Sequence, residues 1–95
     1  MAIGVFVDVF IKEGELGAFM EHMSEMVELT KLEDGCIAYD IYEETDGSGG
    51  VVFMEIWESQ EALDKHMESE HFLRLIPSGD VFFTKPKEVR IFSKL

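Results

Sequence analysis

Three side chains that could act together on an aromatic molecule fall within residues 51–72 of the chain. Glu55 and Trp57 lie in Val51 to Trp57, a run rich in β-branched and aromatic residues that is typical of a buried strand. A carboxylate is unusual in such a run, because burial disfavours its charged form. His66 follows on a segment with helical spacing. A carboxylate and an imidazole beside an indole could exchange protons with a bound ligand.

A strand, a tight corner and a helix would have to bring these side chains together. Ser59 is a favourable N-cap, and Ala62, Leu63, His66 and Met67 follow it at helical spacing. Such a short corner directs the helix back over the sheet. We therefore expect the helix to cover one face of the preceding strand.

The covered strand face carries Phe53, Glu55 and Trp57, because alternate side chains of a strand point the same way. The plain alternative is that Trp57 is a core residue and His66 a histidine with its hydrogen bonds already satisfied. We predict His66, Glu55 and Trp57 as catalytic residues, with His66 accepting a proton and Glu55 orienting its imidazole. As substrate-binding residues we predict Phe53, Tyr39, Met23, His71 and Phe72, with His71 contributing less because Ser69 turns its segment away.

The length and composition indicate a single domain, residues 1–95, that associates with itself. Of the 95 residues, 46% are hydrophobic and 12% aromatic, which is more apolar surface than so short a chain can easily bury. The net charge of −12 disfavours binding to nucleic acid or to an anionic membrane, and we interpret the acidic excess as a solvated surface.

The chain shows no targeting segment and no stretch long enough to span a bilayer, so we expect a cytoplasmic protein. The only cysteine, Cys36, cannot form an internal disulfide, and we interpret it as a small buried hydrophobic residue.

The order of the expected elements is strand, helix, strand, strand, helix, strand. This order predicts an α+β fold, a ferredoxin-like βαββαβ antiparallel sheet with helices on one face. A break in the last helical region is expected at Pro77-Ser78-Gly79. The predicted ranges are 2–11, 15–32, 36–44 and 51–57, then helical segments from Ser59 and from Ser69 to Ile76, and 88–93.

The sequence does not predict a metal site or a nucleotide site. His66 and His71 are five apart, with a helix break expected between them at Ser69, unlike the four-residue spacing of two ligands on one helical face. The glycine-rich segment 45–50 precedes a strand rather than a helix, so it predicts a hairpin connection and not a phosphate-binding loop.

Two sets of residues carry a resemblance to a known protein family. They are Gly35-Cys36-x-x-Tyr39 and Glu55-x-Trp57-x-Ser59-x-Glu61-Ala62-Leu63-x-x-His66-x-x-Ser69-x-His71-Phe72. With them the sequence resembles the antibiotic biosynthesis monooxygenase family of small dimeric α+β barrels. The resemblance extends to Val89-Arg90-Ile91-Phe92 and implies a homodimer in which two sheets face each other.

The resemblance implies a cofactor-independent monooxygenase that oxidises a quinol or a related small aromatic compound. Two alternatives stay open: an isomerase of a small hydroxy-ketone phosphate, as in quorum-signal processing, and a non-catalytic dimeric binder of small molecules. Haem-degrading relatives use an Asn, a Trp and a His where this sequence has Val7 or Asp8, His66 and Ile76, so no haem is predicted.

Overall fold

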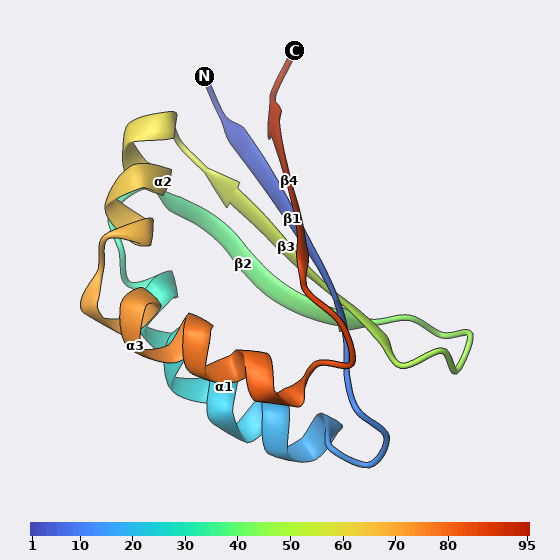
Figure 1. Cartoon of the computed structure of the whole chain (residues 1–95). Coiled ribbons are helices and arrows are strands. Elements are labelled where there is room, and N and C mark those ends of the chain that lie inside the picture. Colours follow the sequence, from blue (N-terminus) through green and yellow to red (C-terminus); the bar gives the residue numbers. More distant parts are fainter.

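All of the helices lie on one face of a four-stranded antiparallel sheet, and the other face is bare (Figure 1). A computed structural model describes residues 1–95. The strand order is β2-β3-β1-β4, which is the ferredoxin-like α+β arrangement that the element order predicted. The elements are β1 (Ile3–Phe10), α1 (Leu16–Lys31), β2 (Cys36–Glu43), β3 (Gly50–Trp57), α2 (Gln60–Met67), α3 (Glu70–Ser78), the 3₁₀ helix η1 (Gly79–Phe82) and β4 (Glu88–Ser93).

Strand β1 is central, with β3 on one side and β4 on the other. One row of paired residues crosses the whole sheet on the helix-covered face. In this row Glu55 pairs with Tyr39 of β2 and with Val5 of β1, and Val5 pairs with Ile91 of β4. The register therefore places the carboxylate of Glu55 under the helices, as the alternation of β3 predicted.

Helix α1 buries Phe19, Met23, Met26 and Thr30 against the sheet. These residues recur at the three-and-four spacing that makes one helical face apolar. Met20, which lies beside this face, is 40% exposed. After the helix, Gly35 turns the chain into β2 with a φ of 85°, a conformation that glycine adopts without steric cost.

The corner after β3 and the start of α3 are both capped by serine side chains. Ser59 Oγ accepts a hydrogen bond from the Ala62 amide, and Ser69 Oγ accepts one from the Phe72 amide. The break expected at Pro77-Ser78-Gly79 coincides with the end of α3 at Ser78, although the chain then passes directly into the 3₁₀ helix η1. Pro77 stands at the end of the helix, where its missing N–H removes only one hydrogen bond.

Strand β2 departs from a regular alternation of side chains. A bulge between Cys36 and Ala38 leaves Ile37 60% exposed, whereas regular alternation along the strand would place it on the same face as Tyr39. Tyr39 itself is buried on the helix-covered face.

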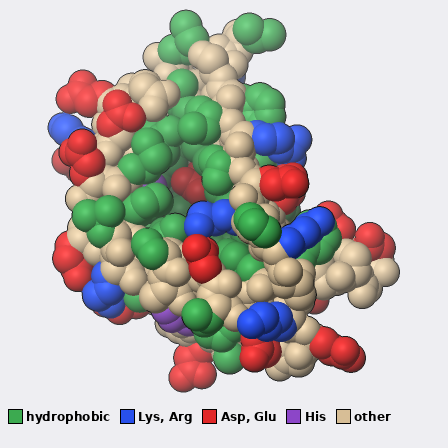
Figure 2. Space-filling view, in the orientation of Figure 1, with side chains coloured by type: hydrophobic (Ala, Val, Ile, Leu, Met, Phe, Trp, Pro, Cys, Tyr) green, Lys and Arg blue, Asp and Glu red, His purple; other side chains and the backbone are tan.

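Figure 2 shows hydrophobic side chains around a hollow between the helices and β4. Val89 and Ile91 of β4 border this hollow and are about half exposed, at 52% and 50%. None of the helices has the length and apolar character required to cross a membrane.

Candidate active site

A cavity of about 120 Å³ lies between the helices and the sheet. Hydrophobic residues make up 14 of its 18 lining residues, and the only ionisable side chains besides Tyr39 are Glu55, His66 and Lys87. An apolar cavity of roughly 150 Å³ binds benzene, so this slightly smaller one is of the size of a single aromatic ring and no larger ligand. Of the predicted site residues, those that line the cavity are Met23, Tyr39, Phe53, Glu55, His66 and Phe72.

Trp57 and His71, the other two predicted site residues, do not line the cavity. Trp57 is fully buried and lies against the imidazole of His66, with 4.5 Å between the ring centroids. The imidazole is also enclosed by Tyr39 and Phe72, whose ring centroids lie 5.8 and 5.2 Å away. Packing on three sides fixes the orientation of the His66 ring.

The carboxyl group of Glu55 is held by its neighbour on the same strand face. Trp57 Nε1 donates a hydrogen bond to Glu55 Oε1 over 3.0 Å. Burial raises the pKa of Glu55 from the usual 4.5 to about 7; the Trp57 hydrogen bond opposes this rise, and the charge of Glu33 adds to it. Glu55 can therefore gain and lose a proton near neutral pH.

Glu33, and not Glu55, orients the imidazole of His66. His66 Nδ1 lies 2.6 Å from Glu33 Oε2. An ionised carboxylate only accepts hydrogen bonds, so Nδ1 carries the proton and Nε2 carries the lone pair. The expectation that Glu55 would orient the ring is wrong, because the side chain of Glu55 is bonded to Trp57.

His66 Nε2 makes no hydrogen bond within the chain, and His66 lines the cavity. Burial lowers the pKa of His66, and the hydrogen bond to Glu33 works in the opposite direction. A neutral imidazole with its free lone pair at a cavity is the arrangement of a general base.

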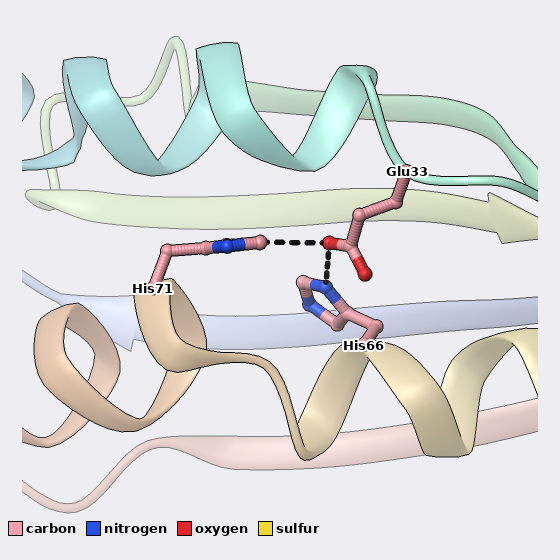
Figure 3. Close-up of side chains that lie close together, drawn as sticks. All are labelled: Glu33, His66 and His71. Carbon is pink, nitrogen blue, oxygen red and sulfur yellow. Dashed lines mark hydrogen bonds and ion pairs between the residues drawn. The ribbon is translucent and has the colours of Figure 1, made fainter.

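His71 reaches the same carboxylate from α3. His71 Nε2 lies 2.8 Å from Glu33 Oε2, so the two imidazoles share one oxygen (Figure 3). The break at Ser69 was expected to turn His71 away; it does keep His71 out of the cavity, but it directs the ring to Glu33 instead.

Tyr39 adds a hydroxyl group to the cavity lining. Burial and the nearby charge of Glu55 raise the pKa of Tyr39, so its phenol stays protonated at physiological pH. A protonated phenol can donate a hydrogen bond to an anion that forms in the cavity.

Glu33 is the site residue that the sequence interpretation missed. In the sequence it lies in the run Glu33-Asp34-Gly35, which indicates only a turn after the first helix. The only available signal was indirect: a histidine on the buried face of a helix needs a polar partner for its second ring nitrogen.

Solved structures of other proteins share this fold over the full length of the chain. A conserved protein from Methanosarcina mazei aligns with a TM-score of 0.96 and 29% identity, over 100% of this chain and 94% of that one. A crystal structure of an antibiotic biosynthesis monooxygenase aligns with a TM-score of 0.88 and 31% identity, over 98% of both chains.

Sequence comparison leads to the same family. Rv0793 of Mycobacterium tuberculosis is 37% identical over 73 residues, which cover 77% of this chain and 71% of that protein. A Synechocystis protein is 26% identical over 85 residues, and the matched part is 58% of its length. The profile of the family described as Antibiotic biosynthesis monooxygenase matches residues 2–77. The chain therefore belongs to the antibiotic biosynthesis monooxygenase family.

Proposed function

We propose that the protein is a cofactor-independent monooxygenase that oxidises a quinol or a related small aromatic compound. The observation that carries this proposal is the free Nε2 of His66 at an apolar cavity, with Nδ1 bonded to Glu33. The cavity volume suits one aromatic ring, and a second ring of a naphthoquinol would extend toward β4.

In the proposed reaction, His66 Nε2 removes a proton from a hydroxyl group of the quinol. The resulting anion is electron-rich, and the Tyr39 hydroxyl group would stabilise it by a hydrogen bond. The anion transfers an electron to dioxygen, and recombination forms a bond between oxygen and a ring carbon. One oxygen atom stays in the product, a hydroxyquinone, and the other leaves as water, which balances the four electrons that dioxygen accepts.

The isomerase alternative is less well supported, because its phosphate would require a free cationic group. Lys87 is the only cationic side chain at the cavity, and its Nζ lies 2.9 Å from Asp80 Oδ1. Arg74 is bonded to Glu25 and Glu70 on the outside of the helices.

A homodimer belongs to the same proposal. The sheet face opposite the helices carries partly exposed hydrophobic side chains with no element over them: Phe6, Phe10, Tyr42, Val52, Met54, Ile56 and Phe92. A second copy of the chain would cover this face with its own sheet. The expected cytoplasmic location is also part of the proposal and can be tested by cell fractionation.

Labelled oxygen tests the proposed reaction directly. Purified protein is mixed with 1,4-hydroquinone or a naphthohydroquinone under ¹⁸O₂, and the product mass is measured. The proposal predicts one ¹⁸O atom per hydroxyquinone formed and one in water. An unlabelled quinone with hydrogen peroxide would contradict monooxygenation, and ligand binding without turnover would favour the binding protein.

A further inference from the structure

Glu33, His66 and His71 bring three potential metal ligands together from three parts of the chain. Glu33 follows the end of α1, His66 is on α2 and His71 is in the first turn of α3. One ligand atom from each, Glu33 Oε2, His66 Nδ1 and His71 Nε2, lies within 4.8 Å of the other two (Figure 3). We propose that these atoms form a binding site for a divalent transition metal ion, with Zn²⁺ as the best-suited ion.

The choice of ion follows from the ligand atoms. Two imidazole nitrogens and one carboxylate oxygen suit Zn²⁺ and its neighbours in the first transition row, whereas Mg²⁺ and Ca²⁺ prefer oxygen ligands throughout. Three protein ligands leave one tetrahedral position for water. Solvent can reach that position because the side chains of Glu33 and His71 remain 17% and 13% exposed.

Small movements would be enough to admit the ion. The two nitrogens lie 2.6 and 2.8 Å from the shared oxygen, while ligand atoms around tetrahedral Zn²⁺ stand about 3.3 Å apart for bonds of about 2.0–2.1 Å. His66 is held by the packed rings of Trp57, Tyr39 and Phe72. Glu33, just after α1, and His71, in the first turn of α3, lie nearer the surface, so they are the ligands that can shift.

Metal binding would reverse the tautomer of His66. A neutral imidazole that coordinates through Nδ1 carries its hydrogen on Nε2. The nitrogen at the cavity would then donate a hydrogen bond instead of accepting a proton. This consequence depends on the proposed function, in which Nε2 is the base, and it makes Zn²⁺ an inhibitor of the reaction.

Calorimetric titration of metal-stripped, full-length protein with Zn²⁺ tests the site without any substrate. We expect one ion per chain, at least a tenfold loss of affinity in His71→Gln, and unchanged affinity in His22→Gln. His22 is a matched control because it lies outside the cluster and bonds to the Leu75 carbonyl oxygen, a contact that glutamine can retain. Circular dichroism of the metal-free variants checks that both are folded.

The site is refuted if the protein shows no saturable binding, or if His71→Gln binds Zn²⁺ as tightly as the unmutated protein. Equal losses in His71→Gln and His22→Gln would also refute it, since binding would then not be specific to the cluster. Absorption of bound Co²⁺ provides a second signal, because a site with two nitrogen ligands should give visible d–d bands that His71→Gln lacks.

Oxygen uptake with and without Zn²⁺ tests the consequence for His66. Each variant is compared with itself, so a change in its basal rate does not matter. We expect Zn²⁺ to suppress uptake by the unmutated protein and by His22→Gln, but not by His71→Gln. Because the calorimetry involves neither quinol nor oxygen, failure of the monooxygenase proposal would leave the binding result intact.

Discussion

The Nδ1 atom of His66 lies 2.6 Å from Oε2 of Glu33, although the two residues are 33 positions apart in the chain. This contact determines which ring nitrogen of His66 faces the cavity with a lone pair. The proposed base therefore depends on a residue that does not itself line the cavity. The same dependence makes Glu33 the most informative position for mutation.

Substitution of Glu33 should lower the turnover rate with little effect on substrate binding. In Glu33→Gln the side-chain oxygen can still accept one N–H, and we expect kcat to fall on the order of tenfold, part of what a positioned base contributes. Glu33→Ala should cost more and also destabilise the fold by about 1–3 kcal/mol, since His66 Nδ1 loses its partner. Steady-state kinetics separate kcat from KM; an unchanged kcat in Glu33→Ala would contradict the orienting role.

Glu55 should make the protein less stable as the pH rises. Folding raises its pKa from 4.5 to about 7, so between these values the folded chain binds more protons than the unfolded chain. The stabilisation of the folded state by this group is at its full value below about pH 4.5 and is lost as the pH rises through 7. The full difference is on the order of 3 kcal/mol.

Glu55→Gln removes this titration and keeps an oxygen to accept the Trp57 hydrogen bond. The variant should be more stable than the unmutated protein at about pH 8, and the gap should shrink at about pH 5. Urea unfolding at the two pH values measures the gap. A gap of equal size at both would mean that Glu55 does not titrate in this range.

Trp57 should report ligand binding although it lies outside the cavity. It is the only tryptophan, and it contacts the two residues that present polar groups to a ligand, His66 by stacking and Glu55 by a hydrogen bond. Titration with a hydroquinone should change its fluorescence after correction for ligand absorbance. A ligand that binds by calorimetry without altering this emission would occupy a different place.

The bare sheet face should hold two copies of the chain together. Light scattering should give twice the 10.9 kDa chain mass. Met54 is 38% exposed on this face, so Met54→Glu should shift the protein toward monomer, because the charge would be buried at the interface. Met20→Glu is the control, since Met20 is equally exposed, at 40%, but lies on α1. Monomeric unmutated protein at micromolar concentration would exclude this dimer.

Much of the fold could be predicted because its signals are local. Ser59 and Ser69 cap helices where the sequence placed them, and alternation in β3 put Glu55 on the covered face. The exposure of Ile37 could not be predicted in this way, because a bulge shifts the pairing of the strand by one residue and leaves no sign in the order of hydrophobic and polar residues.

The contacts of the histidines could not be predicted from local sequence patterns. His22 is partly buried, and its Nε2 lies 3.0 Å from the carbonyl oxygen of Leu75, 53 positions away, a contact that nothing in the sequence pattern indicates. His66 and His71 meet at Glu33 because the packing of α2 and α3 beside the end of α1 brings them there. Spacing within one segment carries no information about such distances.

Oxygen uptake by His66→Gln and His22→Gln, with a hydroquinone as substrate, tests the central claim most directly. If His66 is the base, His66→Gln should lose about 10²- to 10⁴-fold in rate and still bind the aromatic ligand, while His22→Gln should match the unmutated protein. Equal rates in all three proteins would contradict the account.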